Sequence, residues 1–350
     1  MSLLHITSPH THNATNTHDV MVWVLIATLP GVIALTFFFG WGTLINLLLA
    51  SFTAISCEAL ILKIRQRPVG FYLNDYSALV TAILLGLSLP PYSPWWLVVL
   101  GTSFAIIIAK HLYGGLGFNP FNPAMIGYVL LLISFPQAMT QWALPGPLLA
   151  DKTLLTIGES LNAVFLAAPV DGYTGATPLD LFKYQDGLLV EQIYTEQPLF
   201  SKAYWAGVGW EWVNLAFLCG GLLLIYKRII SWHAPISMLL TLTLLACIFY
   251  DGGSSESGGS PLLHLLSGGT MLGAFFIVTD PVTGTTSDRG KLVFGASVGV
   301  IIYTIRIWGN YPDAVAFAVL LMNFAAPFID YYTTPRTYGH QTPDFITRQQ

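Results

Sequence analysis

The segment Asp171-Gly-Tyr-Thr-Gly-Ala-Thr177 combines small residues with hydroxyl groups and is followed by Pro178. Its last threonine carries a hydroxyl, a group that proteins use as a nucleophile. The small neighbours predict that this hydroxyl is accessible, and Pro178 prevents a helix from continuing through Thr177. The same residues are also typical of an ordinary turn, because Asp-Gly and Thr-Gly pairs are common in loops. The residues alone leave both interpretations open.

Ionisable residues inside apolar runs are the second set of candidates. Glu58 lies within one such run and Asp280 ends another, while Lys110 and Arg306 close two more. Charged side chains inside a membrane are costly and are commonly functional. Glu58 and Asp280 are therefore candidates for lining an ion path, with interfacial snorkelling or pairing as the alternative explanation.

The elements that must position these residues are membrane helices. The chain has 350 residues, of which 54% are hydrophobic and 9% are charged, whereas a soluble domain has about 25% charged residues. The 14 basic and 18 acidic side chains cannot cover a water-soluble protein of this size, which excludes a soluble enzyme. A net charge of −4 without a basic tract argues against nucleic acid as a partner. The three cysteines form no C-x-x-C pair, and the sequence predicts no metal site.

Ten apolar segments approach the length of about 20 residues that a helix needs to cross a bilayer. They are residues 20–39, 44–62, 76–90, 94–111, 123–135, 203–226, 234–250, 262–279, 292–307 and 314–330. A long polar interval separates the first five segments from the last five. The predicted fold class is therefore an all-α polytopic membrane protein with about ten transmembrane helices.

Lysine and arginine predict the orientation, because positive charge is retained on the cytoplasmic side. With the N-terminus inside, ten of the 14 basic residues lie in the cytoplasm. Tryptophans, Trp142 and Trp210 among them, lie near the predicted interfaces, as aromatic belts do. The predicted parts are a cytoplasmic tail (1–19), a first membrane unit (20–136), a periplasmic loop (137–202), a second membrane unit (203–330) and a cytoplasmic tail (331–350).

The two membrane units resemble each other. The pattern Leu97-Val98, Gly101, Ser103, Ile107-Ile108 recurs, with one gap, as Leu292-Val293, Gly295, Ser297, Ile301-Ile302. Because each unit has five segments, matching segments cross the membrane in opposite directions, which predicts two inverted five-helix repeats. Folds of this kind build sites near the midplane from short or broken helices. The short segments here end at Pro90 and Pro281.

Residues 171–177 resemble the acceptor signature of flavin transferases, Asp-x-x-(Ser/Thr)-Gly-Ala-Thr. Other ordered strings resemble the D subunit of Rnf (Rsx) electron-transport complexes. They begin at Pro9, Phe39, Tyr113 and Leu266, and the last is the ending Asp330-Tyr-Tyr-Thr-Thr-Pro-Arg-Thr-Tyr-Gly-His340. The similarity runs nearly from end to end of the chain.

The resemblance implies a flavoprotein in which the phosphate of FMN is esterified to Thr177. Asp171, Gly175 and Ala176 would form the motif that a periplasmic flavin transferase recognises. It further implies a subunit of a six-subunit complex of the bacterial inner membrane, which relays electrons between NADH and ferredoxin and couples them to Na⁺ or H⁺ movement. The chain contains no dinucleotide-binding or Walker motif and is not expected to be catalytic alone.

Two alternatives stay open. The B subunit of sodium-pumping NADH:quinone reductases shares the fold and the acceptor motif, but typically has a longer N-terminal region. A transporter or channel without a redox role would use the inverted repeat and would have no need of Thr177.

Overall fold

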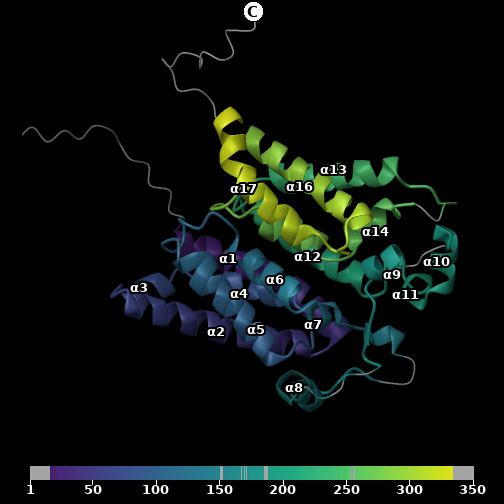
Figure 1. Ribbon diagram of the computed structural model, residues 1–350, viewed down its shortest axis with the longest axis horizontal. Helices are drawn as coiled ribbons and strands as arrows, with labels where there is room; N and C mark the ends of the chain where they lie inside the picture. Colours follow the sequence, from purple (N-terminus) through teal and green to yellow (C-terminus); the bar gives the residue numbers. More distant parts are fainter. Residues whose placement is uncertain are drawn as a thin grey trace, which may run out of the picture.

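The computed structural model describes residues 16–149, 153–166, 168, 170, 172–184, 188–252, 254 and 257–333. Figure 1 shows two packed groups of helices, one from the first half of the chain and one from the second half. Within the described residues, four helices are long and apolar enough to cross a membrane, and further apolar helices are shorter. The architecture is that of a polytopic membrane protein.

The first group follows the first five predicted segments. Its members are α1 (Thr17–Phe39), α2 (Gly42–Ile64), the short α3 (Val69–Leu73), α4 (Ser77–Ser88), α5 (Trp95–Phe104) with its π-helical continuation η1 (Ala105–His111), and α6 (Pro123–Ser134). Helix α2 packs against α4 and α5, and both of these pack against α6. The long apolar runs form helices because a helix satisfies its own backbone hydrogen bonds where water is absent.

The second group follows the last five predicted segments. Its members are α12 (Trp210–Tyr226), α13 (His233–Ile248), α14 (Pro261–Leu266), α15 (Thr270–Leu272) with its π-helical continuation η3 (Gly273–Ile277), α16 (Asp288–Trp308) and α17 (Val315–Thr333). Helix α16 packs along both α13 and α17. The two groups meet where α1 packs against α12 and α6 against α17, which are the first and the last helices of the two groups.

Two of the predicted helical segments differ from the observed helices: one begins later than predicted, and the other is broken. The segment predicted from residue 203 begins its helix only at Trp210, because the Glu211 carboxylate accepts hydrogen bonds from the backbone of residues 204–206 and holds them in a turn. The segment 262–279 breaks at residues 267–269. Gly268 there has φ +57°, and a Cβ on it would lie 2.7 Å from the Asp313 carboxylate. Both interruptions depend on contacts that a hydropathy pattern does not contain.

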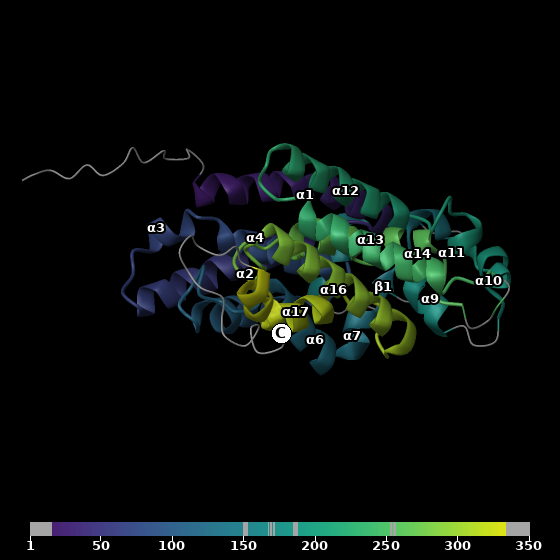
Figure 2. The same ribbon diagram turned by 90° about the horizontal axis from the view of Figure 1, so that it is seen from above.

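The segment between the two groups forms small elements at one end of the molecule. They are α7 (Pro136–Thr140), β1 (Trp142–Ala143), η2 (Gly146–Leu148), α8 (Ile157–Leu166), β2 (Thr174–Gly175), α9 (Pro178–Tyr184), α10 (Val190–Glu196) and α11 (Pro198–Ser201). Strands β1 and β2 are antiparallel, with Trp142 opposite Gly175. This pairing places Thr174 and Gly175, from the segment that resembles the acceptor signature, beside the end of the first group. Figure 2 shows α9–α11 at the end of the molecule opposite α3.

Candidate functional site

Thr177 immediately precedes α9 and caps its N-terminus. Its hydroxyl donates to Asp180 Oδ2 at 2.6 Å, and its backbone N–H donates to the same oxygen at 3.0 Å. In return, the backbone N–H of Asp180 donates to Thr177 Oγ1 at 3.2 Å. This is a reciprocal capping box, with Pro178 as the first helical residue. The local pattern Thr-Pro-x-Asp is a signal from which this cap could have been predicted.

The prediction that the Thr177 hydroxyl is accessible is wrong for the folded chain. Thr177 is only 8% exposed, because Pro178 starts a helix here and the threonine side chain is turned toward that helix. Gly175 is half-buried in β2, and Ala176 is exposed. Asp171, the first residue of the predicted motif, lies outside the described residues.

Thr177 lines a cavity of about 260 Å³ between the two helix groups. One wall comes from α9, through Thr177, Asp180 and Tyr184. The remaining walls come from both helix groups, from β1 and from the loop between α16 and α17, and are rich in aromatic rings: Tyr128, Trp142, Trp210, Phe217 and Tyr311. The Trp142 and Trp210 rings are 5.0 Å apart. An apolar, aromatic cavity with a few polar groups at its edge suits a flat organic ligand.

Glu58 is buried in an ion-pair cluster at the other end of the first group. Its Oε1 lies 2.6 Å from Lys110 Nζ and 3.0 Å from His111 Nε2. Lys110 Nζ also donates to Ser77 Oγ at 2.7 Å, and that hydroxyl donates to Asp75 Oδ1 at 2.6 Å. The structure therefore shows the pairing that the sequence left as an alternative explanation for Glu58.

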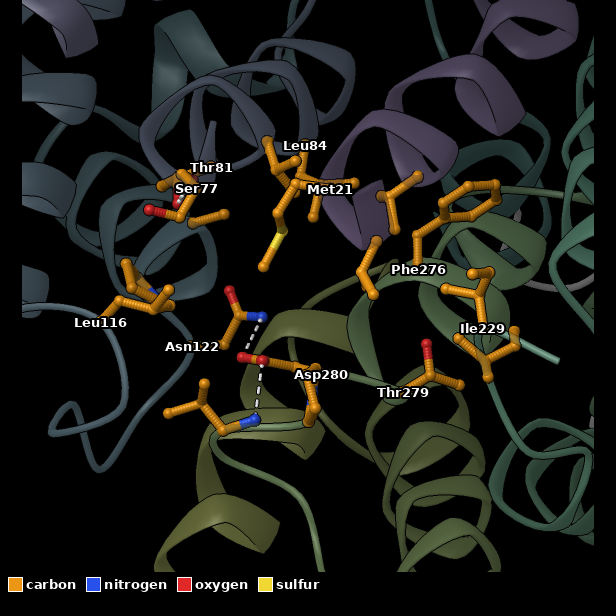
Figure 3. Close-up of a pocket in the computed structure, with 18 of the residues that line it drawn as sticks. Met21, Ser77, Thr81, Leu84, Leu116, Asn122, Ile229, Phe276, Thr279 and Asp280 are labelled. Carbon is orange, nitrogen blue, oxygen red and sulfur yellow. Dashed lines mark hydrogen bonds between the residues drawn. The ribbon is translucent and has the colours of Figure 1, made fainter. Parts of the chain in front are cut away.

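Asp280 lies in the wall of a second, smaller cavity of about 100 Å³ (Figure 3). Its Oδ2 accepts hydrogen bonds from Asn122 Nδ2 at 3.2 Å and Thr283 Oγ1 at 2.9 Å, and its Oδ1 accepts one from Val282 N at 3.1 Å. All three donors are neutral. The Asn122 contact joins the start of α6 in the first group to the end of η3 in the second.

The structure brings Asp280 and the Glu58 cluster to the same cavity. Lys110 and Ser77 line it together with Asp280, and Figure 3 shows Ser77 and Thr81 across the cavity from the carboxylate. Thr177 does not line this cavity. The predicted site residues thus fall into two places, which we call the acceptor cavity, at Thr177, and the carboxylate cavity, at Asp280.

Comparison with known proteins identifies the family of this architecture. The model of the NQR2, RnfD, RnfE family matches residues 5–339. The chain belongs to this family. It is 61% identical over 344 residues to the D subunit of the ion-translocating oxidoreductase complex of Cellvibrio japonicus, covering 98% of this chain and 97% of that protein. The proteins of the same name from Ectopseudomonas mendocina and Pseudomonas aeruginosa PAO1 are 56% and 54% identical, again over 97–98% of both chains. The resemblance to D subunits is confirmed.

Arg306 is a second buried cation, and its contacts are similar to those of Lys110. Arg306 closes the matching helix α16, and its Nη2 lies 2.9 Å from Thr270 Oγ1 and 3.0 Å from Asp313 Oδ1. Lys110 bonds the hydroxyl at the start of α4, and Arg306 bonds the hydroxyl at the start of α15. Equivalent bonds in the two helix groups support an internal repeat.

The sequence analysis did not identify Asp180 or Asn122 as residues of the two sites. Asp180 accepts the hydrogen bond of the Thr177 hydroxyl. Asn122 donates a hydrogen bond to the Asp280 carboxylate. The doubled Asn-Pro pattern at residues 119–123 was the available signal for Asn122. The prediction that Trp142 and Trp210 belong to interfacial belts needs correction, because both line the acceptor cavity and Trp210 is 4% exposed.

Proposed function

We propose that this chain is the flavin-bearing D-type subunit of a redox-driven, ion-translocating oxidoreductase complex, with FMN joined to Thr177 through its phosphate. The names of the relatives support the complex, and the acceptor signature supports the attachment. FMN supplies one-electron and two-electron transfer, so the subunit relays electrons between the NADH and ferredoxin branches of a six-subunit complex. The same names favour a D-type subunit over the B subunit of a sodium-pumping reductase.

The observation that carries this proposal is the position of Thr177 in the wall of the acceptor cavity. The cavity offers aromatic rings from both helix groups for packing against a flat ring system. Asp180 and Tyr184 provide polar groups at its edge. These residues fit a flavin bound beside Thr177, where they would orient the ring system and exclude water from it. A covalent bond would keep the flavin from dissociating between turnovers.

We further propose ten transmembrane helices arranged as two inverted five-helix repeats, with both termini in the cytoplasm. Residues 137–202 then lie on the periplasmic face of the inner membrane, where a flavin transferase can act. The basic residues 63, 65 and 67 precede α3, and the Thr177 segment lies at the opposite end of the molecule. This separation supports the proposed orientation, because basic residues concentrate on the cytoplasmic side.

For the ion path, we propose Asp280 as the main candidate. Its carboxylate faces a cavity and accepts hydrogen bonds from neutral donors. The charge of Glu58 is instead compensated by Lys110 at 2.6 Å. A carboxylate bonded by neutral groups is better able to attract a cation or a proton than one already in an ion pair. Glu58 would act on the path through Lys110, which lines the same cavity.

The experiment that tests the flavin proposal is denaturing gel electrophoresis under ultraviolet light. The full chain, made together with a flavin transferase, should give a fluorescent band. Thr177→Ala should abolish that fluorescence while the protein still accumulates in the membrane. Thr195→Ala, in the exposed face of α10, is the matched control and should stay fluorescent. A fluorescent Thr177→Ala band, or a dark band from the unmodified sequence, would contradict the proposal.

A further inference from the structure

We propose that FMN is attached to Thr177 only while α9 is undocked from the second helix group, and that Lys183 and Tyr184 form the latch that closes α9 afterwards. This inference rests on the proposed attachment of FMN to Thr177. It concerns the order of maturation: the flavin is joined first, and the segment then docks with its flavin in the acceptor cavity.

The burial of Thr177 is the first argument. The side chain is 8% exposed, and its hydroxyl donates to Asp180 at 2.6 Å. The side of Thr177 that is open faces the acceptor cavity, whose walls include Trp142 and Trp210. A transferase must bring the phosphorus of its flavin substrate to about 3–3.5 Å from the hydroxyl oxygen, in line for attack. The docked conformation leaves no room around Thr177 for the active site of another protein.

The chemistry of attachment also requires the cap to open. The Thr177 oxygen forms a bond to the flavin phosphorus of a flavin dinucleotide, and the diphosphate P–O bond breaks. The nucleotide monophosphate leaves with the bonding electron pair, and the hydroxyl proton is lost. The product carries a negatively charged phosphodiester where the hydroxyl had donated to Asp180. Two like charges then lie near each other, and the hydrogen bond from the Thr177 hydroxyl to the Asp180 carboxylate cannot re-form, because its proton is gone.

Buried Pro178 and Leu179 pack the first turn of α9 against its neighbours, and the polar contacts between α9 and the second helix group lie at its other end. Lys183 Nζ donates to the backbone carbonyl oxygens of Ile305 and Arg306 at 3.1 Å and of Tyr311 at 2.9 Å. The hydroxyl of Tyr184 donates to the carbonyl oxygen of Asn310 at 3.1 Å.

These acceptors suit a cation. The first two belong to the last turn of α16, where the helix dipole has its negative end, and the Ile305 carbonyl also accepts the backbone N–H of Gly309. Burial lowers the pKa of the Lys183 ammonium, and the Asp180 carboxylate opposes this shift. The latch is therefore a charge-assisted contact between α9 and the second helix group, separate from the Thr177 cap.

Because α9 has only seven residues, its two ends move together. Opening the latch therefore weakens the hold on the Thr177 end, where the apolar packing of Pro178 and Leu179 remains. Weakening Lys183 should expose Thr177 without altering the hydroxyl, the motif before it or the cavity on the opposite side. The expected consequence is faster labelling, which a variant that simply damages the acceptor site would not show.

The test measures the rate of flavin attachment to the folded chain. Full-length protein made without a transferase is solubilised in detergent, and a purified transferase and FAD are added. Covalent fluorescence is followed with time. Lys183→Met should be labelled about tenfold faster than the unmodified sequence, as expected for losing hydrogen bonds from a charged donor. Tyr184→Phe, which removes one neutral hydrogen bond, should give a smaller increase of about threefold.

Two controls separate the latch from other causes. Lys202→Met removes an exposed lysine from the same segment and should leave the rate unchanged. Lys183→Arg keeps a cationic donor and should restore slow labelling. Equal rates for the unmodified chain, Lys183→Met and Tyr184→Phe would overturn the latch. A chain that stays dark even when made together with the transferase would instead overturn the flavin proposal.

Discussion

The acceptor cavity and the carboxylate cavity both lie between the two helix groups, but their walls differ in chemistry. The acceptor cavity is the larger, at about 260 Å³ against about 100 Å³, and its walls are rich in aromatic rings. The carboxylate cavity has Asp280 in its wall, held by Asn122 and Thr283. Aromatic walls suit a flat redox group, and a half-buried carboxylate bonded by neutral donors suits a cation or a proton. The difference supports the proposal of two separate tasks at one interface between the helix groups.

If the two cavities work separately, a substitution in one should impair its function and leave the function of the other unchanged. Asp280→Asn removes the negative charge and keeps an oxygen that can accept hydrogen bonds. We expect the initial rate of redox-driven ion uptake to fall about tenfold or more, because interactions with a charged group are lost. Covalent flavin fluorescence should be unchanged. The measurement is ion uptake into vesicles containing the whole complex, with fluorescence read from the same samples.

The matched control for Asp280→Asn is Asp288→Asn, an exposed aspartate at the start of α16. It should leave both ion uptake and fluorescence unchanged. Full uptake in Asp280→Asn would remove this carboxylate from the ion path. Loss of fluorescence in Asp280→Asn would show that the two cavities are not independent.

The ion pair beside the carboxylate cavity should matter for stability more than for flavin attachment. Lys110→Met leaves the Glu58 carboxylate buried without its cation, which we expect to cost about 3–5 kcal/mol of unfolding free energy. The double variant Glu58→Gln, Lys110→Met should recover most of this loss, because no uncompensated charge remains. Thermal unfolding of the purified chain measures both. Equal destabilisation of the single and double variants would contradict the role of charge pairing.

The smallest expected effect is at the cap of α9, in the acceptor cavity. In the chain made without a transferase, whose Thr177 hydroxyl is free, Asp180→Ala removes the carboxylate that accepts from both this hydroxyl and the backbone N–H of Thr177. Loss of a cap costs about 1 kcal/mol. Amide hydrogen exchange across residues 178–184 should therefore be about fivefold faster. Glu191→Ala, in the first turn of α10, is the control and should not change exchange in α9. Unchanged exchange in Asp180→Ala would mean that the docked latch alone holds α9.

The helices themselves were predictable from the sequence, and their interruptions were not. Apolar runs predict helices because the backbone must satisfy its hydrogen bonds internally where water is absent. The late start of α12 depends on Glu211 reaching back to three N–H groups, and the break before α15 depends on Gly268 lying against Asp313. Both contacts depend on how side chains pack in the folded chain, and a hydropathy profile does not predict that packing.

The sequence by itself determined that this chain is a membrane protein, which residues are candidates for its chemistry and which family it resembles. These conclusions rest on composition and on short ordered strings, which are properties of the chain before it folds. Only the tertiary structure decided that Thr177 is buried and that Asp180 binds its hydroxyl. It alone decided that Asp280 and Lys110 share a cavity, although 170 positions separate them in the sequence. The physical reason is that burial and ion pairing depend on which helices pack together, and packing brings together residues that no local pattern relates.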